Sequence, residues 1–469
     1  MAPTARVAIA TSFRSVLVPP SKPKRITTMH KCPTRPESAK STANFVLGVA
    51  LLLCSATWPA LAANGSTDNG VMQGFPPAPE FRVNKVNAFQ PPFLRWSIRH
   101  AREVSATRNI GRAARPLSLI DAATRDLDQV TFKAGEEDLT LARYLQDTST
   151  DGLIVLQRGN VIFERYLEGF EPGQPHIWAS MTKSVTGLLA AQFIAEGTLD
   201  PQAKLASYVP ELSGTPFGEA TVQANLDMQV AVAYPEAVPP DLGLFAATGL
   251  IPRNATMPGD IYAFLKIAQM APGEGRFFYQ NGSPEAMAWA LRRISGLNWA
   301  QLVQQRIWSR FAQEDAYVQI DELGTEMASG GISSNLRDTA RFAELVRREL
   351  ARKQGSDSFN QAVRSTFQPG DPTIFAQGNL APGRPGYAYR NYWFQRNDGE
   401  GSVEASGRFG QKIYINPKRE VVIVKLSSTA DQARRATSAD GEAKVAARVI
   451  DSPVTFNNMV NAVLAQLRD

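Results

Sequence analysis

A serine and a lysine stand three residues apart in the tetrad S-M-T-K, from Ser180 to Lys183, where a strongly helical run begins. Residues at this spacing share one face of a helix. A serine hydroxyl becomes an effective nucleophile when a neighbouring base takes its proton, and this lysine is placed to do so. The positive end of the helix dipole would also favour negative charge at Ser180. The same S-x-x-K spacing occurs from Ser21 to Lys24, in a basic leader, where it has no catalytic meaning. The surrounding elements must therefore decide whether the tetrad at Ser180 is catalytic.

A lysine acts as a base only when it is neutral, although its ordinary pKa is about 10.4. Burial or a partner that shares its proton must therefore favour the neutral amine. A tyrosine phenol is the obvious partner because it can later protonate a leaving group. Y-x-N triplets begin at Tyr279, Tyr389 and Tyr414. Tyr414 falls within a predicted strand, whereas Tyr279 lies in a loop before a helix and is the preferred candidate.

Other catalytic chemistries find little support in the sequence. Cys32 and Cys54 are the only cysteines, and both precede residue 63. Beyond that point the histidines are His100 and His176, with no H-E-x-x-H motif and no G-x-S-x-G elbow. We therefore predict no metal, no cofactor and no Ser-His-Asp site, and we expect His176 to be a structural or capping residue.

The basic charge of the chain belongs to its first segment. Residues 1–62 carry eight of the 50 Lys/Arg and one of the 44 Asp/Glu, so the remainder holds 42 basic and 43 acidic residues. This balance argues against a nucleic-acid partner. The apolar run from Phe45 to Ala56 is shorter than the roughly 20 residues that span a bilayer, and a small-x-small site ends at Ala62. We expect a signal peptide cleaved after Ala62, a periplasmic or secreted protein, and no membrane association afterwards; an uncleaved anchor and a start at Met29 remain open.

Strand patterns near both ends of the chain flank a mainly helical middle. Residues 152–157 and 161–166 form one predicted hairpin, and residues 411–417 and 420–428 form a second. This order indicates an α+β fold in which one antiparallel sheet is built from N- and C-terminal strands, flanked by helices. The helix that begins near Ser180 would then start where sheet and helices meet, a common place for a cleft.

The order of strands and helices predicts a chain with three parts. Residues 1–62 form the leader, and residues 63–147 form an extended lead-in followed by a helical stretch. Residues 148–465 form the catalytic domain, with a helical subdomain over about 190–390.

Six segments together resemble the serine β-lactamase and penicillin-recognising superfamily, on its class C and esterase side. They are most similar to its 6-aminohexanoate-dimer hydrolase branch, over roughly residues 75–465. In chain order the segments are TDGLIVLQRGNVIFERY, PHIWASMTKSVTGLLA, FFYQNGS, ASGGISSNLRDTARF, YRNYWF and ASGRFGQKIYINPKREVVIVKLSS. Tyr279 follows Ser180 by 99 residues, which suits the family, whereas Tyr389 and Tyr414 come too late.

The resemblance implies a β-lactamase-like fold and roles for four residues. Ser180 would be the acylated nucleophile and Lys183 its base. Tyr279 would be the general acid and base, with Asn281 hydrogen-bonding near the Ser/Lys pair.

The family's third motif, K-T-G in β-lactamases, corresponds to residues 405–407 here, A-S-G. Gly407 would let the strand approach the substrate closely. The backbone N–H groups of Arg408 and Ser180 would form the oxyanion hole. A register shifted to residues 408–410 remains open.

This third motif lacks the lysine that helps seat the carboxylate of penicillins, and no S-D-N triplet occurs. Arg408 could partly replace the missing charge if its side chain points into the pocket. The departure disfavours efficient β-lactam hydrolysis and favours small amides or esters. Trp178, Tyr234 and Trp393 are candidates for the pocket lining.

The sequence therefore predicts an exported, cofactor-free serine hydrolase acting on a small amide or ester through an acyl-enzyme on Ser180. A D,D-peptidase or weak class C-like β-lactamase is the alternative enzyme. A non-catalytic ligand- or peptidoglycan-binding module is the alternative of another class. Oligomeric state has no signature in the sequence.

Overall fold

The computed structural model describes residues 70–467, apart from 123, 274, 353–354, 356 and 431–447. The predicted leader, residues 1–62, lies outside the described residues. Within the described ranges, no helix combines the length and apolar character needed to cross a bilayer.

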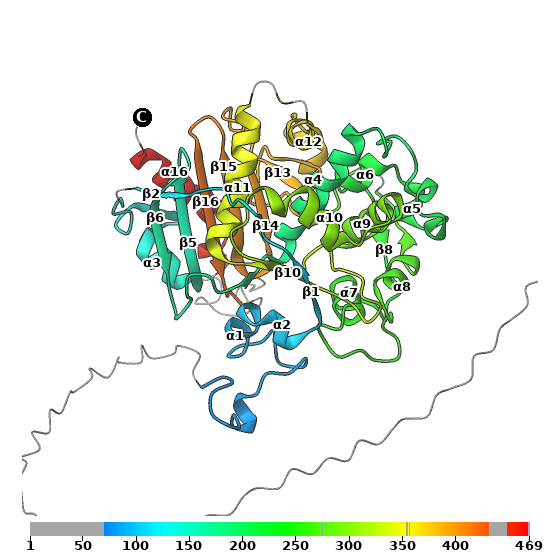
Figure 1. Cartoon of the computed structure of the whole chain (residues 1–469), viewed down its shortest axis with the longest axis horizontal. Coiled ribbons are helices and arrows are strands. Elements are labelled where there is room, and N and C mark those ends of the chain that lie inside the picture. Colours follow the sequence, from blue (N-terminus) through cyan, green and yellow to red (C-terminus); the bar gives the residue numbers. More distant parts are fainter. Residues whose placement is uncertain are drawn as a thin grey trace, which may run out of the picture. The chain divides into compact units, whose positions relative to one another are not determined.

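The main sheet has eight strands and contains both predicted hairpins (Figure 1). The strand β16 pairs with β5, so the C-terminal hairpin joins the N-terminal one. All neighbours are antiparallel except β2 and β6 at one edge. In spatial order the strands are β12 (Ala388–Arg390), β13 (Trp393–Gln395), β14 (Val403–Gly407), β15 (Gln411–Asn416), β16 (Val421–Ser427), β5 (Thr150–Gln157), β6 (Asn160–Tyr166) and β2 (Ile120–Asp121). The predicted sheet built from both ends of the chain is confirmed.

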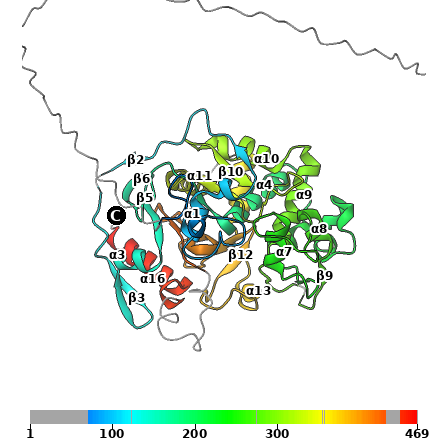
Figure 2. The same cartoon turned by 90° about the horizontal axis from the view of Figure 1, so that it is seen from below.

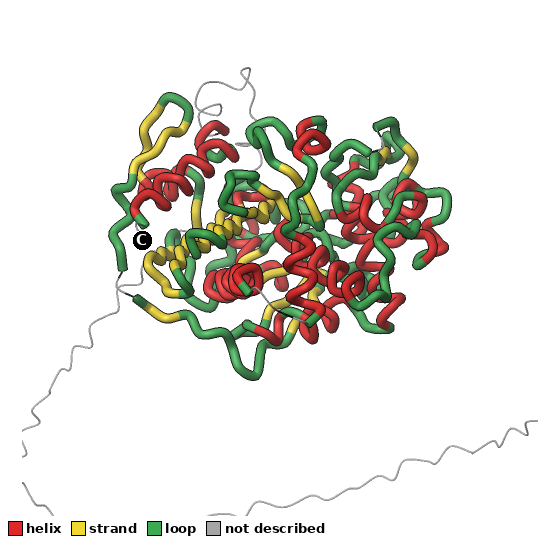
Figure 3. The backbone as a smooth tube through the Cα atoms, turned by 90° about the horizontal axis from the view of Figure 1, so that it is seen from above, coloured by secondary structure: helices red, strands yellow, loops and turns green. Residues whose placement is uncertain are grey.

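Helices cover both faces of this sheet, and every residue of β5 from Leu153 to Leu156 is therefore buried. Successive side chains of a strand point to opposite faces. Leu153 and Val155 belong to a cluster shared with α16 (Pro453–Gln466) and α3 (Leu141–Asp147). The next residues along, Ile154 and Leu156, pack on the opposite face, which α11 (Leu336–Ala351) covers. Figure 2 shows α16 and α11 on opposite sides of the strands, and Figure 3 shows helices on both sides of the strands. The predicted α+β class is confirmed.

The helix that follows Ser180, α4 (Thr182–Ala195), is the centre of the helical region. It is buried from Thr182 to Phe193, so its apolar residues lie on all sides of the helix rather than along one stripe. A Cβ on Gly187 would lie 2.0 Å from the Asn391 carbonyl oxygen, so glycine allows the neighbouring chain to approach. The other helices are α5 (Pro216–Glu219), α6 (Val222–Leu226), α7 (Pro240–Ala247), α8 (Ile261–Lys266), α9 (Gly282–Ser295), α10 (Trp299–Arg306), α12 (Ser358–Thr366) and α13 (Pro372–Ala376).

A second, four-stranded sheet leads directly to Ser180. Its order is β1 (Thr107–Ile110), β10 (Ala316–Gln319), β11 (Ile332–Ser334) and β7 (His176–Ile177). The short remaining elements are α1 (Leu94–Arg99), α2 (Ala101–Val104), β3 (Thr131–Ala134), β4 (Glu137–Thr140), β8 (Val232–Ala233), β9 (Gln269–Met270), η1 (Pro79–Phe81), η2 (Ala179–Met181), η3 (Leu205–Ser207), η4 (Pro210–Leu212), η5 (Trp308–Arg310) and η6 (Arg408–Gly410).

The helical stretch predicted before residue 147 is therefore only partly helical. The strand β1 lies within it and pairs with β10, about 200 residues away along the chain. A local sequence pattern contains no signal of a partner so distant, and β-propensity depends on such context.

A buried ion cluster holds β7, and with it the start of the Ser180 segment, against the main sheet. The Asp151 carboxylate on β5 accepts hydrogen bonds from Arg99 Nη2 at 2.5 Å, His176 Nε2 at 2.9 Å and the Ser428 hydroxyl, and it pairs with Arg95 Nε at 3.1 Å. Burial acts to raise the pKa of Asp151, but the His176 hydrogen bond and the charges of Arg99 and Arg95 outweigh it and leave this pKa below its ordinary value. His176 is therefore a buried residue with a structural role, as its sequence context predicts.

Candidate active site

The backbone turns sharply just before Ser180. Ala179 has a φ of 47°, in the left-handed region that residues with a side chain seldom adopt. This turn carries the chain from β7 into η2 and α4, so that Ser180 precedes the helix and is partly exposed while Lys183 in its first turn is buried. Strained conformations of this kind persist where the surrounding structure holds them.

The Lys183 amine lies among three oxygen atoms. Its Nζ is 2.9 Å from Ser180 Oγ, 2.7 Å from Asn281 Oδ1 and 2.7 Å from the Ser329 carbonyl oxygen. The amide and the carbonyl can only accept, so each takes an N–H from the amine. In the neutral amine, the third position is a lone pair that faces Ser180 and can accept its hydroxyl proton.

Burial lowers the pKa of Lys183 to about 7, while the carboxylates of Glu285 and Asp241 act to raise it. A substantial fraction of the amine is therefore neutral near pH 7. Glu285 also holds the loop that faces Lys183, because its carboxylate accepts hydrogen bonds from Ser329 N at 2.8 Å and Ala328 N at 3.1 Å.

Tyr279 lies beside this pair, with its ring centroid 5.3 Å from Lys183 Nζ. Burial raises the pKa of Tyr279 to about 12, although its hydrogen bond with Ser180 acts in the opposite direction. The phenol is therefore protonated near pH 7 and can donate a proton. Its backbone is fixed by reciprocal hydrogen bonds with the Asn379 side chain at 2.8 and 3.0 Å.

Two other candidate tyrosines have different places. Tyr389 is buried and packs edge-on against Tyr279, with ring centroids 6.2 Å apart. The Tyr414 hydroxyl is 3.0 Å from Ser402 Oγ, within the main sheet. Asn281, by contrast, reaches Lys183 through its oxygen and donates Nδ2–H to Asp241 at 2.9 Å.

The end of β14 lies against the segment that carries Ser180. A Cβ on Gly407 would lie 2.4 Å from the Trp178 carbonyl oxygen, a distance that only glycine permits. Residues 405–407 belong to the strand, whereas residues 408–410 form the turn η6, with Phe409 at a φ of 67°. The strand thus ends at Gly407, and the Arg408 amide follows immediately beside the Ser180 segment.

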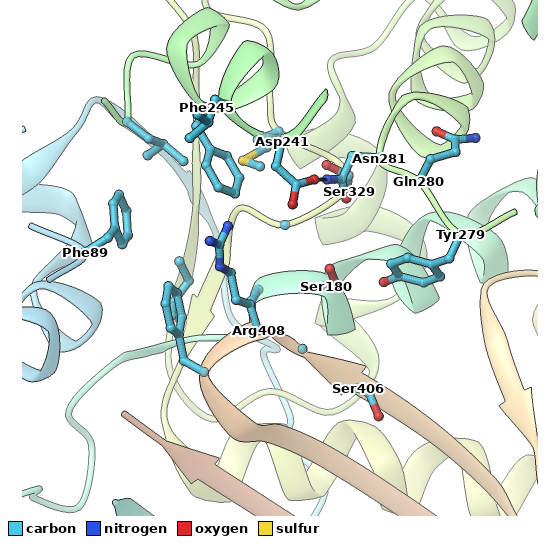
Figure 4. Close-up of a pocket in the computed structure, with 18 of the residues that line it drawn as sticks. Phe89, Ser180, Asp241, Phe245, Tyr279, Gln280, Asn281, Ser329, Ser406 and Arg408 are labelled. Carbon is cyan, nitrogen blue, oxygen red and sulfur yellow. Dashed lines mark hydrogen bonds between the residues drawn. The ribbon is translucent and has the colours of Figure 1, made fainter. Parts of the chain in front are cut away.

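Ser180, Tyr279 and Asn281 line a cavity of about 640 Å³ (Figure 4). Its lining includes the apolar side chains of Val86, Phe89, Leu242, Phe245, Leu250 and Ile251. It also includes the charged residues Lys85, Asp241, Arg384, Arg408, Lys412 and Asp451.

Comparison with known proteins identifies the family. The model of the family described as Beta-lactamase matches residues 139–448, well over half of the chain. The chain belongs to the beta-lactamase family. It is 30% identical to a putative 6-aminohexanoate-dimer hydrolase from Bacillus anthracis, with a TM-score of 0.72 over 82% of this chain and 97% of that one. It is also 29% identical to the 6-aminohexanoate-dimer hydrolase of Paenarthrobacter ureafaciens over 353 residues, covering 73% of this chain and 87% of that protein.

The resemblance drawn from the six sequence segments is thereby confirmed, as is the β-lactamase-like fold. This beta-lactamase family member is a serine hydrolase of the amidase and esterase kind. Which substrate it takes is a separate question that depends on the cavity.

The aromatic residues predicted to line the pocket do not do so in this family member. Trp178 is fully buried and donates its Nε1–H to Ser334 Oγ at 2.8 Å. Trp393 is buried in the core beside Phe342 and Phe367, and Tyr234 stacks on Phe264. None of the three is among the described residues that line the cavity. The sequence shows that these three residues are aromatic, but packing partners that are distant along the chain decide whether they are buried in the core or face the cavity.

Several cavity residues have no motif that would reveal them. Phe89 comes from the predicted lead-in and stacks on Phe409 at 6.0 Å, which places an N-terminal segment in the wall of the cavity. Arg384 and Lys412 also escape sequence reasoning. The Arg408 guanidinium lies 5.1 Å from the Phe245 ring centroid, and its side chain extends into the cavity (Figure 4).

Proposed function

We propose that the chain is an exported serine hydrolase that cleaves a small amide or ester through an acyl-enzyme on Ser180. One observation carries this proposal: Lys183 Nζ lies 2.9 Å from Ser180 Oγ, with its pKa lowered to about 7 by burial. A neutral amine at this place can activate the serine, which an ordinary surface lysine cannot do.

In the acylation step, Lys183 Nζ takes the proton of Ser180 as Oγ attacks the substrate carbonyl carbon. The carbonyl oxygen becomes an oxyanion facing the backbone N–H groups of Ser180 and Arg408. When the intermediate collapses, the bond to the leaving nitrogen or oxygen breaks. Tyr279 gives its proton to that atom and regains one from the Lys183 ammonium, so the amine or alcohol departs neutral.

Deacylation reverses these roles. A water molecule loses a proton to the Tyr279 and Lys183 pair and attacks the ester carbonyl on Ser180. Ser180 Oγ then leaves as the ester bond breaks and regains a proton from Lys183. The products are the carboxylic acid and free enzyme.

The relatives named 6-aminohexanoate-dimer hydrolase support linear aminohexanoate-like dimers as substrates to test first. The apolar run and cleavage site before residue 63 support export to the periplasm or beyond. No nucleic-acid or lasting membrane partner is proposed, because the chain beyond residue 62 is nearly neutral.

The test is the intact mass of the protein after reaction with a fluorophosphonate probe. We expect one adduct on the wild type, none on Ser180→Ala, and greatly slowed labelling of Lys183→Met. Ser309→Ala, which alters an exposed serine, is the matched control and should label normally. An unlabelled but folded wild type would contradict the proposal and favour the non-catalytic binding module.

The same preparations should be offered p-nitrophenyl esters, the aminohexanoate dimer and nitrocefin. Faster turnover of nitrocefin than of the dimer would favour the β-lactamase alternative. That outcome would leave the role of Ser180 intact but would overturn the substrate proposal.

A further inference from the structure

A second cavity, of about 260 Å³, is separate from the one that Ser180 lines. None of the residues that line it belongs to the lining of the Ser180 cavity. Part of its wall comes from the residue that follows α6, from α13 with the residues before it, and from β12. Pro369 and Asp371 in this wall are exposed, so a small molecule can enter from solvent.

Arg390 on β12 brings to this second cavity a positive charge that no ion pair neutralises. In the described part of the chain its guanidinium forms no hydrogen bond or ion pair, and its buried Nε has no partner. Its charge acts on the carboxylate of Asp227, which lines the same cavity, without forming an ion pair with it. Because a partly buried charge usually has a partner, Arg390 has the capacity to bind a ligand.

Asp227 offers the opposite charge, and one of its oxygen atoms is already in use. Its Oδ1 accepts hydrogen bonds from Asn391 N at 3.0 Å and from Gln223 Nε2 at 2.9 Å. Among the described residues nothing donates to its Oδ2, so this oxygen can still accept. Burial raises the pKa of Asp227 to about 6, although the two hydrogen bonds and the charge of Arg390 act to lower it. The contacts within the protein therefore do not fully compensate this carboxylate.

Opposite charges that line one small cavity without pairing favour a ligand that carries both charges. A carboxylate on the ligand would accept hydrogen bonds from Arg390, and an ammonium group would donate to Asp227 Oδ2. A simple anion would leave Asp227 without a partner, and a simple cation would leave Arg390 without one. The rings and alkyl groups of Phe277, Ile374 and Phe375 add an apolar wall for a side chain.

Two rings in the wall of the second cavity also pack against Tyr279. Phe277 and Tyr389 line this cavity, with their ring centroids 5.0 Å apart. The Tyr279 ring centroid is 6.4 Å from that of Phe277 and 6.2 Å from that of Tyr389. A ligand in the second cavity would therefore contact rings that support the Ser180 site without entering that site.

We propose that the second cavity binds a small zwitterion of the α-amino acid type, with Arg390 for its carboxylate and Asp227 for its ammonium group. Both charged groups of such a molecule are attached to one carbon atom, and an apolar side chain on that atom would pack against the ring of Phe277. The inference goes beyond the proposed function, because it requires no chemistry at Ser180.

The first test is a calorimetric titration of Ser180→Ala protein, in which Ser180 cannot hydrolyse the ligands. The ligands are L-leucine, L-leucinamide, which lacks the carboxylate, and 4-methylpentanoate, which lacks the ammonium group. We expect leucine to bind about tenfold more tightly than either analogue, or better, because each analogue loses charge-assisted hydrogen bonds. Equal binding of either analogue would overturn the proposal. So would the lack of saturation at about 10 mM leucine, ten times a millimolar dissociation constant.

Variants then assign the ligand to the second cavity. Arg390→Gln and Asp227→Asn each remove one charge, and asparagine keeps an oxygen for the hydrogen bonds already made at position 227. Each variant should bind leucine about tenfold more weakly, or worse. Lys85→Gln and Asp241→Asn are the matched controls, because they remove a cation and a carboxylate that line the Ser180 cavity. These controls should bind leucine as the parent protein does, and the reverse pattern would overturn the proposal.

A last titration uses wild-type protein whose Ser180 carries the fluorophosphonate group. This group occupies the Ser180 cavity and leaves the second cavity open, so leucine should bind within a few-fold of its affinity for Ser180→Ala protein. Loss of binding would place leucine in the Ser180 cavity and overturn the proposal. The titrations of Ser180→Ala protein need neither labelling nor turnover, so they decide the inference even if the proposed chemistry at Ser180 fails.

Discussion

Gly407 lies directly against the carbonyl of Trp178, so close that a Cβ would stand 2.4 Å from that oxygen and 3.2 Å from Ala179 Cβ. Trp178 and Ala179 immediately precede Ser180, and Arg408 immediately follows Gly407. A single backbone contact therefore sets the distance between the two amides proposed to form the oxyanion hole.

Replacing this glycine should damage catalysis more than folding. In Gly407→Ala the methyl group must displace backbone, which moves the Arg408 N–H away from the oxyanion. We expect kcat to fall about 100- to 1000-fold, the usual loss for one oxyanion donor. Steady-state kinetics with p-nitrophenyl esters would measure it. Gly259→Ala is the control, because its Cβ would meet nothing nearer than 3.6 Å. Equal activity of the two variants would refute this role of the contact.

The role of Tyr279 can be tested through the basicity of the leaving group. Tyr279→Phe removes the phenol whose pKa is raised to about 12 and which is proposed to protonate the departing amine. Hydrolysis of an amide should fall about 100- to 10,000-fold. The rate of p-nitrophenyl ester hydrolysis should fall less, because p-nitrophenolate departs without a proton. Tyr389→Phe is the matched control, and an unchanged amide rate in Tyr279→Phe would remove this tyrosine from the mechanism.

Activity should depend on the protonation of Lys183. The base works as a neutral amine, so kcat/KM should rise with pH through an apparent pKa of about 7. Asp241 acts to raise the pKa of Lys183, and Asp241→Asn should therefore move the rising limb to lower pH. Asp138→Asn, which alters an exposed ion pair with Lys133, should leave the profile in place. A shift of the Asp241→Asn limb to higher pH would contradict the electrostatic explanation.

Phe89 should affect which substrates are accepted. Its ring stacks on Phe409, and the ring centroids of Phe89 and Phe245 are 6.4 Å apart, so Phe89→Ala would widen the cavity beside these two aromatic rings. Loss of one buried aromatic contact is worth roughly 1.5–3 kcal/mol, or about tenfold or more. We expect this loss in kcat/KM for hexanoyl esters and a smaller one for acetyl esters, with partial recovery in Phe89→Leu. A uniform loss across chain lengths would instead indicate a general disturbance of the fold.

Asp151 should matter for stability. Asp151→Asn leaves buried Arg99 without its carboxylate, and breaking such a buried pair typically lowers the free energy of unfolding by about 3–5 kcal/mol. The pKa of Asp151 is below its ordinary value of 3.8, so its contribution is present above that pH and is lost as the pH falls through the folded-state pKa. Thermal unfolding at neutral pH would show a lower midpoint in the variant. Asp138→Asn, on an exposed pair, should change it little.

Local patterns in the chain were sufficient for much of the fold. The hairpins β5–β6 and β15–β16 follow from alternating apolar residues and a short turn, with Gly159 at a φ of 80°. The pairing of Ser180 with Lys183 follows from helical spacing. The loop before a helix favoured Tyr279, and the family resemblance supported it and added Asn281; the structure brings both to the same amine.

Local signals failed where a residue's surroundings come from far along the chain. Trp178 and Trp393 are aromatic like many pocket residues, yet distant partners bury both in the core. Phe89 and Arg384 have no motif, yet packing places both in the wall of one cavity.

By itself, the sequence predicted the two hairpins, the superfamily and the adjacent pair of Ser180 and Lys183, because these depend on neighbours within a turn or a strand pair. Only the tertiary structure decided the lowered pKa of Lys183, the approach of Gly407 to Trp178 and the mixture of apolar and charged side chains around one cavity. Those properties depend on burial and on close approach between segments up to hundreds of residues apart, which no local pattern records.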